Sequence, residues 1–116
     1  MPDYRSKTST AGRKLAGARA QLTFLRQVAS LPEAAELKSR LAQDAGDDEA
    51  AFQLAIHQLA RQQYETALDG LLRLFMRNRS YGDDLPRKTL VQVFDLLGNE
   101  HPLVISYRRK LYQALY

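Results

Sequence analysis

Residues 87–116 read RKTLVQVFDLLGNEHPLVISYRRKLYQALY, and they carry the signature of two helices joined by a short turn. Pro86 and Pro102 each stand where a helix is expected to begin, and Gly98 stands where the first helix is expected to end. Between these markers apolar residues recur every three or four positions, which is the spacing of one buried helical face. The pattern predicts a helical hairpin.

The preceding segment, residues 47–78, repeats this organisation. Asp47 or Asp48 is expected to cap its first helix, and a tight turn is expected near Gln62–Gln63. Small Ala55 and Ala67 allow the two helices to approach closely in an antiparallel pair. The expected buried stripes are Phe52, Ile56, Leu59 and Ala60 in the first helix, and Tyr64, Ala67, Leu68, Leu71, Leu72 and Phe75 in the second.

Two further helices are expected before this pair. In the first, Leu22, Leu25 and Val28 follow helical spacing, and the second is expected to run from Pro32 to about Ala45–Gly46. Together these patterns predict an all-α fold of about five to six helices in antiparallel hairpins, spanning residues 20–116.

The composition narrows the classes of function. A chain of 116 residues supports one domain, and the absence of cysteine excludes disulfides, thiolate metal sites and iron–sulfur clusters. The apolar runs fall far short of the roughly 20 residues that a membrane-spanning helix requires. The first 20 residues lack the apolar region of a secretory signal. We therefore expect a cytoplasmic protein that does not enter a membrane.

The positive charge lies in the leader. Residues 1–20 hold five basic residues and one acidic residue, a net charge of +4, whereas residues 21–116 hold twelve of each. We expect residues 1–19 to form a partly disordered basic leader that ends before the helical domain. An alternative function for this basic arm is to bind nucleic acid, although the neutral body does not favour it.

No group of residues predicts catalysis. His57 stands among apolar residues without a second ligand at metal-binding spacing, and His101 precedes Pro102, where a turn or cap is expected. The carboxylates at 47–49 and at 83–84 each precede an expected helix, where negative charge is favourable. We expect no enzyme activity, no catalytic residues, no cofactor and no metal.

The expected last helix carries more apolar and aromatic residues than one buried face can use. Val104, Tyr107, Leu111 and Ala114 can dock on the preceding helix, which leaves a second stripe on the other side. Tyr, Arg and aliphatic residues together are typical of the energetic centres of protein interfaces. We therefore expect a partner protein to contact Ile105, Arg108, Arg109, Tyr112 and Tyr116.

Stacked helical hairpins also form a concave surface, which is expected to be lined by the first helix of each hairpin. The candidate contact residues there are Phe52, Gln53, Ile56, Gln63 and Arg87. Apolar edges at the two ends of the stack would also favour self-association into a homo-oligomer.

Residues 47–78 have the length of one tetratricopeptide unit, and they resemble that motif at Leu54, Ala55, Tyr64 and Ala67. Two positions depart from the motif, because Gln62 stands where it prefers Gly and Arg79 where it prefers Pro. The hairpins are thus expected to be tetratricopeptide-like.

Residues 20–116 resemble the C-terminal tetratricopeptide-like half of bacterial thioredoxin-like co-chaperones. The resemblance rests mainly on RKT at 87–89, LG at 97–98 and YRRKLY at 107–112, running to LY at 115–116. It implies a co-chaperone role in which helical surfaces contact chaperones, including the chaperonin, and unfolded client proteins. It does not reach that family's thioredoxin-like domain, so it implies no thiol chemistry.

The leader, MPDYRSKTSTAGRKLAGARA, instead resembles the N-terminus of dihydroxyacid dehydratase, and this similarity ends at about Ala20. The cysteines and metal-binding carboxylates of that enzyme have no counterpart in residues 21–116. The alternative identity is therefore a catalytically incompetent fragment that resembles the dehydratase in its leader alone. The junction near Ala20 is compatible with a natural fusion or with a misassigned start.

Overall fold

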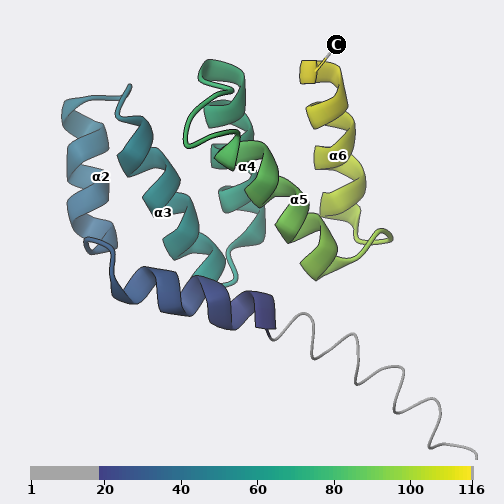
Figure 1. The fold of residues 1–116 in the computed structure, drawn as a ribbon, viewed down its shortest axis with the longest axis horizontal. Coiled ribbons are helices and arrows are strands. Elements are labelled where there is room, and N and C mark those ends of the chain that lie inside the picture. The colour runs from purple at the N-terminus through teal and green to yellow at the C-terminus, as the bar shows by residue number, and fades with distance from the viewer. Residues whose placement is uncertain (1–18, 116) are drawn as a thin grey trace, which may run out of the picture.

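The computed structural model describes residues 19–115, and these residues form helices and turns without a strand. A helix over residues 19–29 is followed by five more helices (Figure 1). Their bounds are α2 (Ala34–Gln43), α3 (Asp48–Ala60), α4 (Tyr64–Arg77), α5 (Leu85–Leu97) and α6 (Pro102–Leu115). The all-α prediction is confirmed. The expected basic leader falls outside the described residues, apart from Arg19.

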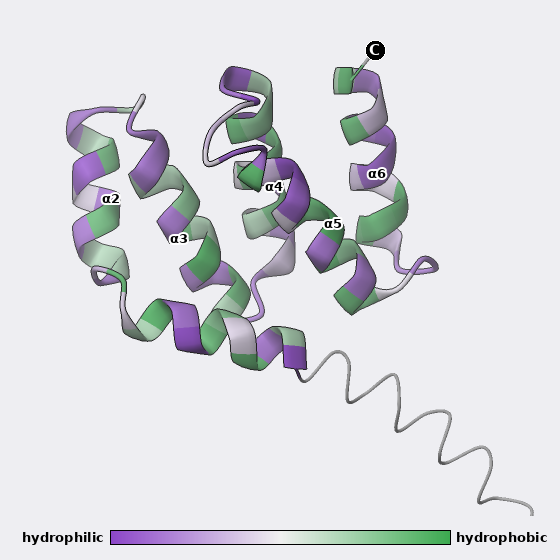
Figure 2. Ribbon diagram, viewed as in Figure 1, coloured by the Kyte–Doolittle hydropathy of each residue, from purple (hydrophilic) through white to green (hydrophobic). Residues whose placement is uncertain are grey.

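Helix α4 lies at the centre of the arrangement and packs against α3, α5 and α6. Helix α2 packs against the other side of α3, while helix 19–29 runs across the lower ends of α2 and α3 (Figure 1). Apolar and hydrophilic residues alternate around the helices (Figure 2), because each helix buries one face and leaves another in water.

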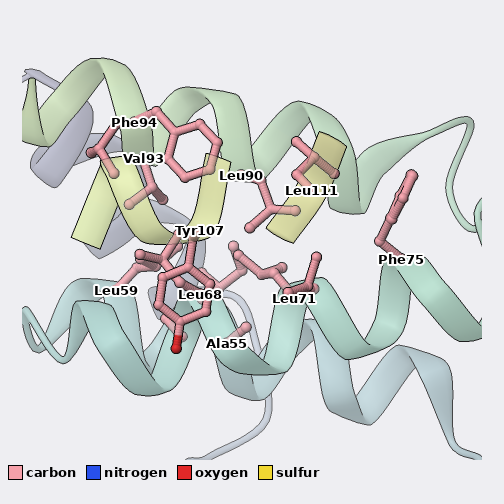
Figure 3. Close-up of a cluster of buried hydrophobic side chains, with 14 of the residues drawn as sticks. Ala55, Leu59, Leu68, Leu71, Phe75, Leu90, Val93, Phe94, Tyr107 and Leu111 are labelled. Carbon is pink, nitrogen blue, oxygen red and sulfur yellow. The ribbon is translucent and has the colours of Figure 1, made fainter. Parts of the chain in front are cut away.

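Most of the buried apolar side chains form one cluster, to which helix 19–29 and helices α3 to α6 contribute, whereas the buried Ala34 and Leu37 of α2 lie outside it. Helix α4 contributes more residues to this cluster than any other helix, as expected for a helix that packs against three others (Figure 3). The members are Phe24, Ala55, Ile56, Leu59, Ala67, Leu68, Leu71, Leu72, Phe75, Leu90, Val93, Phe94, Val104, Tyr107 and Leu111. The predicted stripe of α3 is confirmed at Ile56 and Leu59, whereas Phe52 and Ala60 are half-buried at its margin.

The helix boundaries follow the expected chemistry at most positions. Asp47 caps α3, because its Oδ1 accepts a hydrogen bond of 3.0 Å from the backbone N–H of Ala50. Gly98 ends α5 with a φ of 94°, a conformation that favours glycine. Pro102 is the first residue of α6, and Pro86 lies in the first turn of α5.

Asp84 corrects one expectation about these boundaries. It precedes α5 with a φ of 68°, yet its side chain makes no capping hydrogen bond. The carboxylate instead accepts a hydrogen bond from Arg87 Nε at 2.6 Å. Asp84 therefore contacts the first turn of α5 through an ion pair with Arg87 and not through a capping hydrogen bond.

The second correction concerns the first two helices. Helix α2 begins at Ala34 and not at Pro32, since Glu33 is still extended with a ψ of 152°, and it ends at Gln43, before Ala45. In helix 19–29, Leu22 and Leu25 are about half exposed, while Phe24 is buried at 1 % exposure. The helix therefore presents a different face to the core from the one that the leucine spacing predicted.

Polar contacts of Gln21 explain that choice of face. Gln21 lies about one turn before Phe24, and its Nε2 donates to the carbonyl oxygens of Leu59 (3.0 Å) and Ala60 (2.8 Å) at the end of α3. The Tyr64 hydroxyl donates to Gln21 Oε1 at 3.2 Å. The last carbonyls of a helix lack partners inside that helix, so Gln21 fixes helix 19–29 on the α3–α4 turn.

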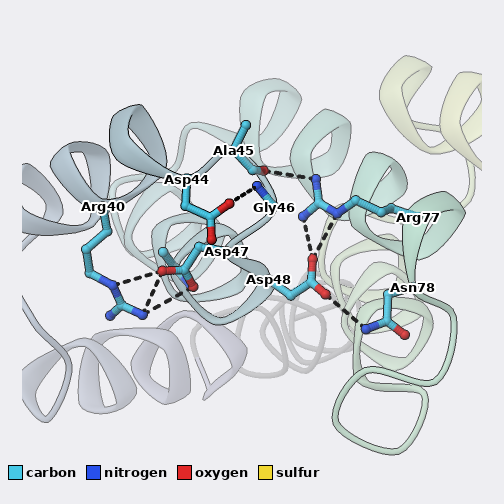
Figure 4. Close-up of polar contacts among 9 residues, drawn as sticks. Arg40, Asp44, Ala45, Gly46, Asp47, Asp48, Arg77 and Asn78 are labelled. Carbon is cyan, nitrogen blue, oxygen red and sulfur yellow. Dashed lines mark hydrogen bonds and ion pairs between the residues drawn. The ribbon is translucent and has the colours of Figure 1, made fainter.

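A second polar network joins α2, α3 and α4 at their upper ends (Figure 4). The Asp48 carboxylate accepts hydrogen bonds from Asn78 Nδ2 (2.9 Å) and Arg77 Nε (2.8 Å), and Arg40 pairs with Asp47 at 3.0 Å. The Asn78 hydrogen bond, followed by Arg77, lowers the pKa of Asp48 against the opposing effect of desolvation. The network therefore favours the ionised carboxylate at the start of α3.

Candidate functional site

Helix α6 has two apolar faces with opposite environments. Val104, Tyr107 and Leu111 point into the core and are at most 6 % exposed. On the other face Ile105 is 51 % exposed and Tyr112 is 54 % exposed. A single surface helix needs only one buried stripe, so the outer stripe of α6 is available for another contact.

The outer face of α6 continues into a groove beside α5. Ile105, Arg108, Arg109, Tyr112 and Gln113 line a shallow depression on α6. A groove of about 200 Å³ between α5 and α6 is lined by Arg87, Val91, Phe94, Arg108, Leu111, Tyr112 and Leu115. The two share Arg108 and Tyr112 and are therefore continuous. We call this surface the α5/α6 face and define it by the half-buried Arg108 and the exposed side chains of Arg87, Val91, Ile105, Arg109, Tyr112 and Leu115.

Two contacts hold the guanidinium of Arg108 in place on this face. Its Nη2 donates to Asn99 Oδ1 at 2.9 Å, and its Cζ lies 5.5 Å from the centre of the Phe94 ring. Arg87 is held differently, because its Nη2 lies 2.6 Å from Asp84 Oδ2. Arg108 thus offers a positioned cation to a partner, whereas the charge of Arg87 is already partly neutralised.

The last turn of α6 is fastened to the body by Arg79, from the α4–α5 connection. Arg79 Nη2 donates to the carbonyl oxygen of Ala114, and its guanidinium lies 5.2 Å from the centre of the Phe75 ring. A cation at the C-terminal end of a helix is also favoured by the helix dipole. This contact keeps Tyr112 and Leu115 in register with the groove.

The structure brings most of the residues predicted on the last helix together. Ile105, Arg108, Arg109 and Tyr112 share the depression on α6, while Tyr116 lies outside the described residues. Sequence reasoning missed Val91, 41 % exposed, and Leu115, 37 % exposed. Each directly follows a residue of the inner face, so an extra apolar residue beside the buried stripe was the signal available in the sequence.

The residues predicted for a concave surface do not form one site. Ile56 is 2 % exposed and belongs to the core, which corrects its assignment to a binding surface. Phe52 is half-buried, with its ring centre 5.9 Å from that of Tyr81. Gln53 lies one turn after Glu49 and donates to it at 3.3 Å, with its own Oε1 buried and unpaired.

The other two members of that set lie elsewhere. Gln63 is exposed in the α3–α4 turn, beyond the end of α3 at Ala60, which itself lies about 10.5 Å along the helix axis from Gln53 at 1.5 Å per residue. Arg87 lies on α5 and lines the groove with Tyr112. The α5/α6 face therefore gains Arg87, and the remaining residues stay apart from one another.

The histidines have structural contacts. His57 is 8 % exposed, and its Nε2 lies 2.7 Å from the carbonyl oxygen of Pro32, to which it donates. His101 Nδ1 accepts a hydrogen bond of 3.1 Å from the backbone N–H of Leu103 at the start of α6. Within residues 19–115, no three His, Asp or Glu side chains are grouped as metal ligands.

Three buried or half-buried tyrosines have raised pKa values. Burial raises the pKa of Tyr64, Tyr81 and Tyr107, with nearby carboxylates adding to the effect at Tyr81 and Tyr107. A raised pKa keeps these groups protonated at neutral pH, in which form they donate hydrogen bonds.

None of the helices in the described part of the chain is long and apolar enough to cross a membrane.

Comparison with known proteins adds one match. A family model described as "Tetratricopeptide repeat" matches residues 27–116. No curated protein and no solved structure matches the chain. The matched residues include the last three residues of helix 19–29, all of α2 to α6 and the whole α5/α6 face.

Proposed function

The chain belongs to the tetratricopeptide repeat family, and on that premise we propose that it is a non-enzymatic protein-interaction module that binds its partner through the α5/α6 face. Repeats of this family generally mediate contacts between proteins. The observation that carries the proposal is the outer stripe of α6, where Ile105 and Tyr112 are more than half exposed beside Arg108 and Arg109.

The composition of this face supports binding to a protein surface. Tyrosine and arginine are enriched among the residues that dominate binding energy at interfaces. Tyr112 offers a large apolar ring with few rotatable bonds, and Arg108 is already held by Asn99 and Phe94. A partner would therefore order few additional side chains, which lowers the entropic cost of association.

The first partner we propose is a chaperone, in particular the chaperonin. The second candidate is an unfolded client protein. This identification rests on the resemblance of residues 20–116 to the C-terminal half of thioredoxin-like co-chaperones. On the same resemblance we propose that the protein is cytoplasmic.

A pull-down with purified chaperonin tests this function. The wild-type chain is expected to retain the chaperonin, and Ile105→Asp or Arg108→Glu is expected to lower the retained amount at least about tenfold, because each places a carboxylate on the contact surface.

Deleting residues 101–116 is unsuitable, since it removes Val104, Tyr107 and Leu111 from the core. Met76→Asp is the matched control, because Met76 is 64 % exposed on α4, outside the α5/α6 face. Equal retention of all variants would contradict the proposal.

A further inference from the structure

Building on this proposed function, we infer the chemistry of the partner: the α5/α6 face takes an acidic amphipathic helix, whose apolar stripe lies along the groove between α5 and α6. Three features of the described residues lead to this inference. They are the distribution of charge, the line of exposed apolar side chains and the lack of backbone groups that could pair with an extended peptide.

The charges of the body are segregated along the chain. Residues 85–116 hold five basic and two acidic residues, a net charge of +3, whereas residues 21–84 hold seven basic and ten acidic residues, a net charge of −3. The two acidic residues, Asp95 and Glu100, line a separate depression at the α5–α6 turn. The groove therefore lies in the basic part of a body that is neutral as a whole.

Within the part of the chain that the structure describes, some cations around the groove have an acidic partner and others have none. Arg87 pairs with Asp84 at 2.6 Å, and Lys88 lies 3.7 Å from Asp83. Among residues 19–115 no carboxylate forms an ion pair with Arg108 or Arg109. Since Arg108 is also positioned by Asn99, a carboxylate on the partner could pair with it without reorganising the face.

The exposed apolar side chains have the spacing of a helix interface. Ile105 and Tyr112 lie seven residues apart on α6, which is about 10.5 Å at 1.5 Å per residue. Val91 from α5 and Leu115 from α6 extend this line across the groove, over a floor formed by Phe94 and Leu111. A partner helix with apolar residues at i, i+3, i+4 and i+7 presents a stripe of similar length.

The backbone around the groove favours a helix over an extended strand. The walls are α5 and α6, whose backbone N–H and C=O groups bond within each helix. An extended peptide would bring its own backbone groups against this apolar floor without partners, which is costly. A helical partner satisfies its backbone internally and exposes only side chains to the groove.

A synthetic peptide tests the inference with the full chain. The probe is a fluorescein-labelled peptide of about 16 residues, with leucine at helical i, i+3, i+4 and i+7 spacing and glutamate on both sides of the stripe. We expect its fluorescence anisotropy to report binding that weakens as salt is raised. The same peptide with lysine at each glutamate position, and a scrambled acidic peptide, are expected to bind at least about tenfold more weakly.

Protein variants locate the site. The double change Arg108→Glu and Arg109→Glu, and separately Ile105→Asp, are expected to weaken binding of the acidic probe at least about tenfold. The controls are Arg73→Glu and Met76→Asp on α4, which remove an exposed cation and an exposed apolar side chain away from the groove. They are expected to leave the affinity within about twofold of wild type.

Several outcomes would overturn the inference. They are equal binding of the lysine or scrambled peptide, an unchanged affinity in the Arg108 and Ile105 variants, and displacement of the probe by single-stranded nucleic acid. Sedimentation showing a dimer that Ile105→Asp dissociates would assign the face to a second copy instead. Chaperonin retention without probe binding would reject the acidic helix as the ligand and leave the proposed chaperonin binding in place. Probe binding without chaperonin retention would support the acidic helix and reject the chaperonin as the partner.

Discussion

Replacing Phe24 with alanine is expected to lower the free energy of unfolding by about 3–5 kcal/mol, which is the usual loss when a buried phenylalanine is truncated. Phe24 is 1 % exposed and is the contribution of helix 19–29 to the main core. Its neighbour Leu25 is 48 % exposed, so Leu25→Ala is expected to change the free energy of unfolding by less than about 0.5 kcal/mol.

Urea unfolding followed by circular dichroism at 222 nm compares these two variants. The adjacent positions share one helix, so helix propensity affects both in similar ways. A small and equal loss for both variants would mean that helix 19–29 does not pack on the domain through Phe24. A large loss for Leu25→Ala alone would mean that the helix presents its leucine face instead.

The second large effect is expected at neighbouring positions on α6. Val104 is fully buried and Ile105 is 51 % exposed. Val104→Asp places an unpaired charge in the core and is expected to cost more than about 4 kcal/mol, enough to unfold a small domain. Ile105→Asp lies in water near the N-terminal end of the helix, where negative charge is tolerated, and is expected to leave the fold intact.

Thermal unfolding and one-dimensional proton NMR distinguish these outcomes. Val104→Asp is expected to lose the cooperative transition and the dispersed methyl signals, whereas Ile105→Asp keeps both. The Ile105 variant is then suited to binding experiments, because any loss of binding cannot come from unfolding. A cooperative transition near that of wild type in Val104→Asp would contradict the two-faced arrangement of α6.

Local signals in the sequence were sufficient to predict the helices that follow Asp47, up to the last helix of the chain. Proline at a helix start, Asp47 at a cap and Gly98 at a helix end act through a few neighbouring atoms, so their effects can be predicted without the fold. The apolar stripe of α4 was predicted from its spacing for the same reason, and all its members except the half-buried Tyr64 are buried. Local patterns did not settle Asp84, because its left-handed backbone depends on the whole α4–α5 connection.

The face of helix 19–29 could not be predicted from spacing. Leu22, Leu25 and Val28 satisfy the helical period as well as Gln21, Phe24 and Val28 do. The choice depends on how this helix crosses the α3–α4 turn, where Gln21 donates to the carbonyl oxygens of Leu59 and Ala60 at the end of α3. Pairings between distant segments decide such a face, and one sequence does not reveal them.

In the candidate site, too, some features follow from local sequence spacing and others depend on contacts between helices. The stripe from Ile105 to Tyr112 lies on one helix, so sequence spacing was enough to place it. The groove depends on α5 lying beside α6, and therefore Val91 and the position of Arg87 required the structure. Ile56 was placed on a surface because its helix was expected to line a concave face, but that residue points into the core.

The most direct test of the α5/α6 face is a titration of the ¹⁵N-labelled chain with the acidic amphipathic peptide, followed by amide chemical shifts. The changes are expected to concentrate in α5 and α6, with the largest around Val91, Ile105, Arg108 and Tyr112, and to saturate together as a single site fills. Changes centred on α2 and α3, or no changes at peptide concentrations that saturate the anisotropy signal, would contradict the account.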